Sequence, residues 1–350
     1  MLEEVLFSQE GQIGFITLNR PNALNALTLT MILAMQKQLQ LWKEDHSIHA
    51  VLLRAAPGNA FCAGGDVRWL YNAGKAHDSQ QTQFFWHEYR LNHFIHHLGK
   101  PYISLIDGMV MGGGVGVALH GSHPVACERF VFAMPETSIG FFPDIGASYL
   151  LNRCPGHLGL YLGLTGNRLD PQDALQAGLV KQTVRSENMP QLVTALLNED
   201  LSTNAHARVD ACLLTHAMAH AETDLSTVLP VIDRCFSQPT VELIRASLQN
   251  IGLAWAAKVD SLLEKKCPLS LKVTLAQLQK TKDLSLAECL KIDYDLARHF
   301  MQGRDFYEGV RALLIDKDKN PQWDPPQLHL VSDTRVLGFF EAFDDGLEFG

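Results

Sequence analysis

The chain of 350 residues is 47% hydrophobic and 19% charged, and its formal net charge is −9. This composition is typical of a globular protein with one large domain or a core and an extension, and the acidic balance argues against nucleic acid as a partner. The seven cysteines are odd in number, scattered and never spaced as CxxC, which indicates reduced thiols in an intracellular protein and no zinc site.

The first twenty residues carry no recognisable sorting signal. They are acidic and strand-like, without a basic start followed by an apolar run and without an Arg- and Ser-rich amphipathic start. No apolar run in the chain approaches the roughly 20 residues that cross a bilayer. We therefore expect a cytoplasmic protein with no membrane partner.

Strand-like and helix-like segments alternate along the first half of the chain. The runs VLFSQ and IGFITL predict an opening hairpin, and residues 26–45 then change to a helical period. The buried side of that helix is expected to contain Met31, Leu33, Met35, Leu39 and Leu41. A second helix is predicted at about 79–98, and the later strands are expected at 50–56, 102–108 and 125–136.

This alternation favours an α/β layered fold. From residue 189 onward the period is helical, and several segments have Ser, Thr or Asp near their starts, where N-caps belong. We therefore divide the chain into a core, residues 1–188, and a mostly helical C-terminal region, residues 189–350.

Two glycine-rich loops, FCAGGD at 61–66 and MGGGVG at 111–116, each follow a predicted strand and precede a predicted helix. Either loop alone is compatible with a tight turn. The second loop lacks the Lys-Ser/Thr pair of a phosphate-binding loop and the third glycine of a dinucleotide fingerprint. What remains is a pair of backbone N–H donors suited to a developing oxyanion.

Two carboxylates, Glu136 and Asp144, lie eight residues apart in PETSIGFFPDIG. One interpretation is structural, a helix cap and a turn. In the other, Phe141 and Phe142 desolvate both acids, which raises their pKa values and makes them useful as base, acid or nucleophile. The residues by themselves leave both interpretations open.

Other nucleophile and metal patterns are weaker. His93, His96 and His97 have a spacing that could bind a metal, but no HExxH motif or carboxylate pattern completes a site, so we predict a polar helix face and no metal. No GxSxG motif supports a serine triad. Cys62 lies inside the first glycine loop, but no histidine is placed in the sequence to activate it.

In this order, ITLNRPNALNAL, AFCAGGD, MGGGVG and MPETSIGFFPD resemble the enoyl-CoA hydratase/isomerase (crotonase) superfamily. The C-terminal segments SLKVTLAQLQ and GRDFYEGVRALLIDKDKNPQW are similar to the branch that hydrolyses 3-hydroxyisobutyryl-CoA in valine breakdown. The resemblance implies a ClpP/crotonase-like fold of repeated β-β-α turns with a helical C-terminal region. It implies an acyl-CoA substrate and no separate cofactor, since CoA is part of the substrate, and it is compatible with a homo-oligomer.

The resemblance also implies roles for individual residues. The N–H groups of Gly65 and Gly113 would form the oxyanion hole for the thioester oxygen. Glu136 and Asp144 match the active-site carboxylates, and Glu88 matches a further substrate-contacting acid. Glu136 would attack the carbonyl or activate water, and Asp144 would bind the 3-hydroxyl group or assist proton transfer to the departing thiolate.

One departure from the superfamily pattern concerns Gly116. Hydratases of the superfamily have a second glutamate at this place, which helps to position water for addition to a double bond. Because glycine offers no carboxylate, we expect thioester hydrolysis, with 3-hydroxypropionyl-CoA as a second substrate candidate. Two alternatives are an enoyl-CoA hydratase or isomerase, and a non-catalytic interaction protein with the same fold, against which the intact acids argue.

Overall fold

The computed structural model describes residues 3–219 and 223–349. Contacts within the chain divide it into two compact units that alternate along the sequence. Unit 1 consists of Met1–Gly65, His87–Phe132 and Leu169–Thr223, and unit 2 of Asp66–Trp86, Ala133–Arg168 and Asp224–Gly350. The boundary expected at residue 188, between a core and a mostly helical C-terminal region, stays a prediction.

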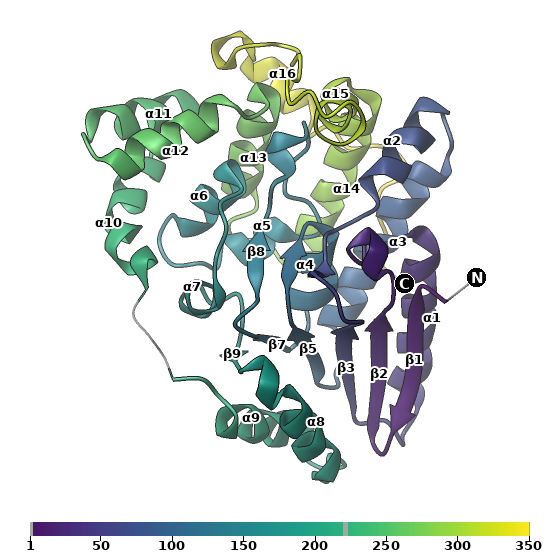
Figure 1. The fold of residues 1–350 in the computed structure, drawn as a ribbon. Helices are drawn as coiled ribbons and strands as arrows, with labels where there is room; N and C mark the ends of the chain where they lie inside the picture. The colour runs from purple at the N-terminus through teal and green to yellow at the C-terminus, as the bar shows by residue number, and fades with distance from the viewer. Residues whose placement is uncertain (1–2, 220–222, 350) are drawn as a thin grey trace. The chain divides into compact units, whose positions relative to one another are not determined.

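Unit 1 is built on a six-stranded sheet with the order β1-β2-β3-β5-β7-β9 (Figure 1). The first pair is an antiparallel hairpin, as predicted, and the remaining pairs are parallel. The strands are β1 (Val5–Glu10), β2 (Ile13–Leu18), β3 (Ala50–Ala55), β5 (Tyr102–Ile106), β7 (His123–Ala126) and β9 (Gln182–Thr183).

A second sheet, with the order β4-β6-β8, accounts for the repeating pattern. Its short strands are β4 (Ala60–Cys62), β6 (Met109–Met111) and β8 (Val131–Ala133), and each follows a strand of the first sheet in the chain. Helix α2 (Val67–Lys75) follows β4, and helix α4 (Gly113–Leu119) follows β6. The expected β-β-α repeats are therefore confirmed. The first glycine-rich loop joins β4 to α2, and the second joins β6 to α4.

Helix α1 (Leu29–Glu44) begins after Thr28, whose hydroxyl caps the helix by accepting from the N–H of Met31. Its buried side chains are Met31, Ile32, Met35, Leu39 and Trp42. The prediction that Leu33 and Leu41 are buried is wrong, since they are 43% and 57% exposed. At 100° per residue these two positions point away from the stripe that the other residues form.

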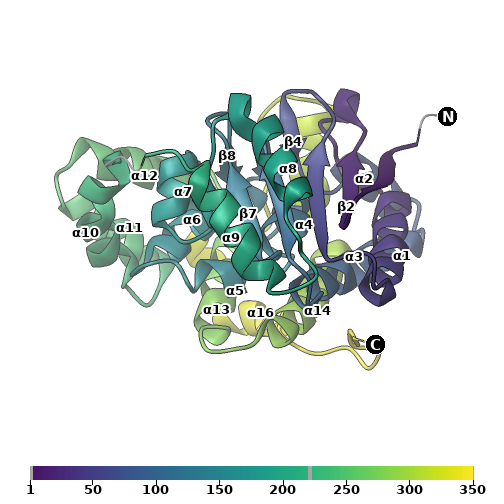
Figure 2. The ribbon, with the colours of Figure 1, turned by 90° about the horizontal axis from the view of Figure 1, so that it is seen from below.

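The core of unit 1 lies between the large sheet and two later helices, α8 (Met189–Asn198) and α9 (Ala205–Thr215). Both helices lie side by side in Figures 1 and 2. Apolar residues on alternate positions of the strands, such as Ile13, Phe15 and Ile103, pack with Leu192 and Val209 of these helices. This packing covers one face of the large sheet.

Unit 2 is largely helical, and its remaining helices are α5 (Ala147–Leu151), α6 (Leu158–Thr165), α10 (Asp224–Phe236), α11 (Val241–Asn250), α12 (Ala254–Glu264), α13 (Pro268–Lys280), α14 (Leu286–Gln302), α15 (Asp305–Val310) and α16 (Asp333–Gly338). Helix α14 has Ser285 as its N-cap, as a serine near the start of the segment predicts, and Ser285 and Glu288 form a capping box. Within the described ranges no helix is long and apolar enough to cross a membrane.

Candidate active site

The two glycine-rich loops lie against each other in unit 1. Gly64 has φ +104°, and a Cβ atom at this position would lie 3.3 Å from the backbone nitrogen of Gly113. A Cβ atom on Gly113 would lie 3.1 Å from the backbone nitrogen of Gly65. The structure therefore brings together the two amides that the resemblance assigns to the oxyanion. The positive φ of Gly64 favours glycine, and a side chain at either position would be in tight contact with the other loop.

Helix geometry makes the Gly113 amide available. Gly113 is the first residue of α4, after Gly112 at the N-cap, and the N–H of a first helical residue has no acceptor within its helix. Glu88, on helix α3 (Gln80–His96), faces the same point: any side chain at Gly113 would collide with its Oε1. Gly65, Gly113 and buried Glu88 thus form one cluster in unit 1.

Glu136 lies in unit 2, at the start of a short 3-10 helix, Glu136–Ser138. Its side chain is 5% exposed, and its Oε2 has no hydrogen-bond partner among the described residues. Burial, followed by the negative charge of Asp144, raises the pKa of Glu136 well above its usual value. Glu136 is therefore a buried acid and not part of a surface turn, and its catalytic role stays a prediction.

The two phenylalanines between the acids, Phe141 and Phe142, are buried. Phe141 is buried and contacts Phe142, Phe300 and Phe306, and it stacks on Phe85 with ring centroids 5.9 Å apart. This apolar cluster keeps water from the loop that joins the two acids. Exclusion of water disfavours the charged form of a carboxyl group, which is the physical cause of the raised pKa.

Asp144, 6% exposed, lies in the same loop, Pro143–Gly146. It is not the N-cap residue of the following helix, because α5 begins at Ala147 with Gly146 as its N-cap. Ile145 and Gly146 both have positive φ, 59° and 71°. For a β-branched residue such a backbone is strained, and it persists only where surrounding contacts hold it.

Asp293 and Gln277 make the contacts that hold this strained backbone in place. The Gly146 N–H donates to Asp293 Oδ2 at 2.7 Å, and the Gln277 amide donates to Pro143 O at 3.0 Å and to Asp293 Oδ1 at 2.7 Å. Burial raises the pKa of Asp293 well above its usual value. Sequence reasoning missed this residue; the available signal was an acid in the apolar stripe of α14, four residues from Cys289 and four from Ala297.

Lys266 is a second residue that the motifs did not indicate. It is only 7% exposed, its Nζ donates to Ser138 Oγ at 2.6 Å, and burial lowers its pKa to about 8. Its positive charge favours the ionised form of Glu136 and opposes the effect of burial on that acid. Nothing in the local sequence distinguishes it from its exposed neighbour Lys265.

The remaining candidates do not form a second site. Burial raises the pKa of Cys62 to about 12, and its Sγ donates to Asn25 O at 3.0 Å, so this thiol is a poor nucleophile. The rings of His93 and His97 lie against each other in a tilted arrangement, with centroids 4.2 Å apart. Over residues 3–219 and 223–349, no group of three or more His, Cys, Asp or Glu side chains could hold a metal ion.

Known proteins resemble the chain over almost its whole length. Residues 13–340 match the enoyl-CoA hydratase/isomerase family model. The chain is 44% identical over 343 residues to the mitochondrial 3-hydroxyisobutyryl-CoA hydrolase of Xenopus tropicalis and 42% identical over 348 residues to that of Homo sapiens. Each alignment covers 97% of this chain and 89% of the relative.

Two solved structures resemble the fold just as completely. A carnitinyl-CoA dehydratase from Mycobacterium thermoresistibile is 37% identical, with a TM-score of 0.93 over 99% of both chains. An enoyl-CoA hydratase from Rhodobacter sphaeroides 2.4.1 is 35% identical, with a TM-score of 0.91 over 99% of this chain and 100% of that one.

These comparisons correct one expectation. The prediction of a cytoplasmic protein is wrong, because the curated relatives are named as mitochondrial enzymes. Composition and cysteine usage indicate that thiols stay reduced, but they do not distinguish one compartment from another.

Proposed function

The chain belongs to the enoyl-CoA hydratase/isomerase family, and we propose that it hydrolyses 3-hydroxyisobutyryl-CoA to the free hydroxyacid and CoA. The observation that carries this proposal is the buried Glu136 carboxylate beside Asp144, in a chain with glycine at position 116. Relatives at 42–44% identity carry the name of that hydrolase. The proposal extends to 3-hydroxypropionyl-CoA as a second substrate and to valine breakdown as the process.

In the proposed reaction the amides of Gly65 and Gly113 bind the thioester oxygen and stabilise the tetrahedral oxyanion. One such donor contributes about 3–4 kcal/mol to transition-state stabilisation. The Glu136 carboxylate attacks the carbonyl carbon, the C–S bond breaks, and CoA leaves as a thiolate that takes up a proton. Water then hydrolyses the anhydride and regenerates the carboxylate.

Activation of a water molecule by Glu136 gives the same products in one step and stays an alternative. In either case an ionised carboxylate in an apolar surrounding is a stronger base and nucleophile than a solvated one. Asp144 would bind the 3-hydroxyl group or assist proton transfer to the thiolate. We propose no cofactor beyond the CoA of the substrate.

Release of free thiol from a panel of acyl-CoA esters tests the proposal. We expect release from 3-hydroxyisobutyryl-CoA, and loss of that release in the Glu136→Gln variant. One general acid or base contributes about a hundred- to ten-thousandfold to the rate, so the loss should be at least of that order. Near-normal thiol release by Glu136→Gln would contradict the assignment.

The enoyl-CoA hydratase among the two similar solved structures favours a second candidate, addition of water to an enoyl-CoA. That activity would remove the conjugated enoyl absorbance of crotonyl-CoA without releasing thiol. We rank it second because Gly116 lacks the carboxylate that the superfamily's water addition employs. A non-catalytic interaction protein would give neither signal, so the same panel separates all three.

A further inference from the structure

A buried amide on α3 lies one helical turn beyond Glu88. Asn92 is 0% exposed, and neither its Nδ2 nor its Oδ1 has a hydrogen-bond partner among the residues that the structure describes. A buried polar group without a hydrogen bond destabilises the fold, because burial has removed its hydrogen bonds to water. Such a group calls for an explanation, and a bound ligand group is one of the few that restore the lost hydrogen bonds.

The amide faces the helix that carries the oxyanion glycine. A Cβ atom on Gly116 would lie 2.5 Å from Asn92 Nδ2 and 3.0 Å from its Oδ1. Glu88 faces Gly113 in the same way. Because Glu88 and Asn92 are spaced i, i+4 on α3, and the two glycines i, i+3 on α4, each pair lies on one face of its helix.

This spacing places the amide about 5 Å, one helical turn, along α4 from the oxyanion glycine. In the proposed substrate the hydroxyl group is on the second carbon beyond the thioester carbonyl, a span comparable to one turn. A primary amide can donate to the oxygen of a hydroxyl group and accept its proton at the same time. A hydroxyl group there would satisfy both atoms of Asn92.

We propose that Asn92 binds the 3-hydroxyl group of the acyl chain, and that glycine at position 116 is needed to leave room for its amide. This inference rests on the proposed hydrolase function and deepens it. It assigns selection of hydroxyacyl groups to Asn92, and it leaves Asp144 the other role considered for it, proton transfer to the departing thiolate.

The test compares 3-hydroxyisobutyryl-CoA with isobutyryl-CoA, which differs only by the missing hydroxyl group. For Asn92→Leu, which is similar in volume but apolar, the ratio of kcat/KM for the two substrates should fall by about 10- to 100-fold or more. A site built to bind a hydroxyl group by hydrogen bonds discriminates by at least this much. The control is Ser104→Ala, which removes another buried, unpaired polar atom, on β5; its ratio should not change.

Thermal unfolding without ligand separates binding from a structural role. Since Asn92→Leu removes two unsatisfied polar atoms, its Tm should equal or exceed that of the wild type, whereas loss of a structural hydrogen bond would lower it. Gly116→Ala gives an independent measurement if Asn92→Leu does not fold. Its added methyl group should displace the amide and lower the same ratio, and the double variant should lose no more than either single variant.

Two outcomes overturn the inference: an unchanged ratio, which includes an equal loss on both substrates, or a lowered Tm in an Asn92→Leu variant that folds. If the wild type releases thiol from 3-hydroxyisobutyryl-CoA and one of these outcomes is found, only the role of Asn92 is wrong. If the wild type releases no thiol from that substrate, the proposed function is wrong, and the inference falls with it.

Discussion

At the scale of single residues, Glu136 must be ionised in surroundings that favour its neutral form. Burial and the charge of Asp144 raise its pKa, while Lys266 lowers it. If the ionised form is active, activity falls as the pH drops through that pKa. Removing the positive charge in Lys266→Met should raise the pKa and move the acid limb of the kcat/KM profile to higher pH.

The matched control for this shift is Lys265→Met, which removes the same charge from the exposed neighbouring position. Its acid limb should coincide with that of the wild type, because an exposed charge is screened by solvent. An acid limb that stays in place in Lys266→Met would show that Lys266 does not influence the ionisation of the essential group.

The buried carboxyl group of Glu136 should also lower the free energy of unfolding at neutral pH. A folded-state pKa above the usual 4.5 means that the folded chain binds more protons than the unfolded chain above that pH, so stability is lost as pH rises between the two values. Glu136→Gln removes this penalty, and its Tm at neutral pH should equal or exceed that of the wild type although activity is lost. The prediction is wrong if calorimetry finds a lower Tm at neutral pH, or a gain that is as large at pH 4.

At the scale of elements, α13 and α14 hold the loop that carries Asp144. Asp293 of α14 accepts from Gly146 N–H and from the Gln277 amide of α13. In Asp293→Ala both donors lose this acceptor, at about 1–3 kcal/mol for each group left unpaired. Without it the strained backbone at Ile145 should relax, and kcat should fall by at least tenfold while KM changes less.

Asp293→Asn is the test of this positioning role. The asparagine keeps the volume and one carbonyl oxygen, so it should still accept from Gly146 N–H and restore most of kcat. If Asp293→Asn loses as much kcat as Asp293→Ala, a carboxyl group is required and simple support of the loop is not the explanation. Equal kcat in Asp293→Ala and the wild type would exclude a positioning role altogether.

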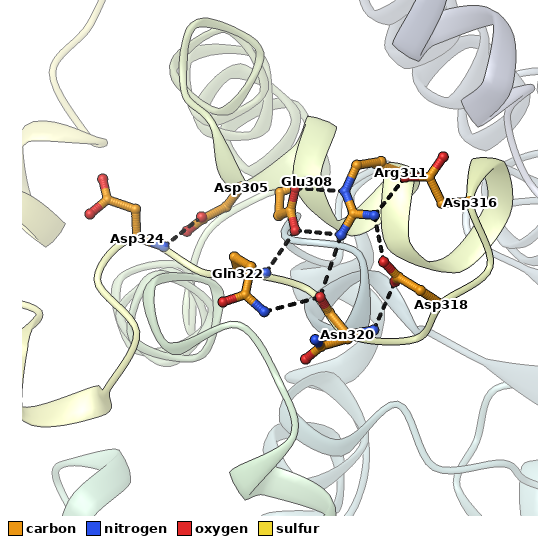
Figure 3. Close-up of polar contacts among 8 residues, drawn as sticks. All are labelled: Asp305, Glu308, Arg311, Asp316, Asp318, Asn320, Gln322 and Asp324. Carbon is orange, nitrogen blue, oxygen red and sulfur yellow. Dashed lines mark hydrogen bonds and ion pairs between the residues drawn. The ribbon is translucent and has the colours of Figure 1, made fainter.

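The guanidinium group of Arg311 contacts the segment that follows α15 and holds it in place (Figure 3). Arg311 donates to Glu308 at 2.8 and 3.0 Å, and to Asp316 and Asp318 at 2.7 Å each. Glu308 also accepts from Gln322 N–H at 2.7 Å. A planar fork with five donors suits this arrangement, and a lysine offers only a point charge.

We therefore expect Arg311→Lys to loosen residues 316–322 without unfolding the rest of unit 2. Amide hydrogen exchange should rise within that segment and stay unchanged in α13 and α14. Arg304→Lys, at an exposed position on the preceding turn, is the control and should leave the exchange rates as they are. Uniformly faster exchange across unit 2 in Arg311→Lys would show that the contacts stabilise the whole unit.

At the scale of the whole molecule, the sequence could predict what depends on local pattern. The β-β-α repeats, the glycine-rich loops and the two acids are short-range signals, and the close approach of Gly65 and Gly113 follows from equivalent loops after strands of one sheet. The supporting residues depend on tertiary contacts: Lys266 lies 128 residues from Ser138, and Asp293 lies 147 residues from Gly146. Burial of Asn92 beside Gly116 likewise depends on how α3 packs on α4, which periodicity does not reveal.

The reactivity of the cysteine thiols reports on how tightly the chain is packed around them. The prediction of reduced cysteines is confirmed: all seven are free and buried. Burial raises the pKa values of Cys62 and Cys154 to about 12, so few thiolates are available to react at neutral pH. The native protein should therefore react slowly with a free-thiol reagent, and the denatured protein should give seven equivalents. Rapid labelling of a native thiol would show that a unit opens, and fewer than seven equivalents after denaturation would contradict the free thiols.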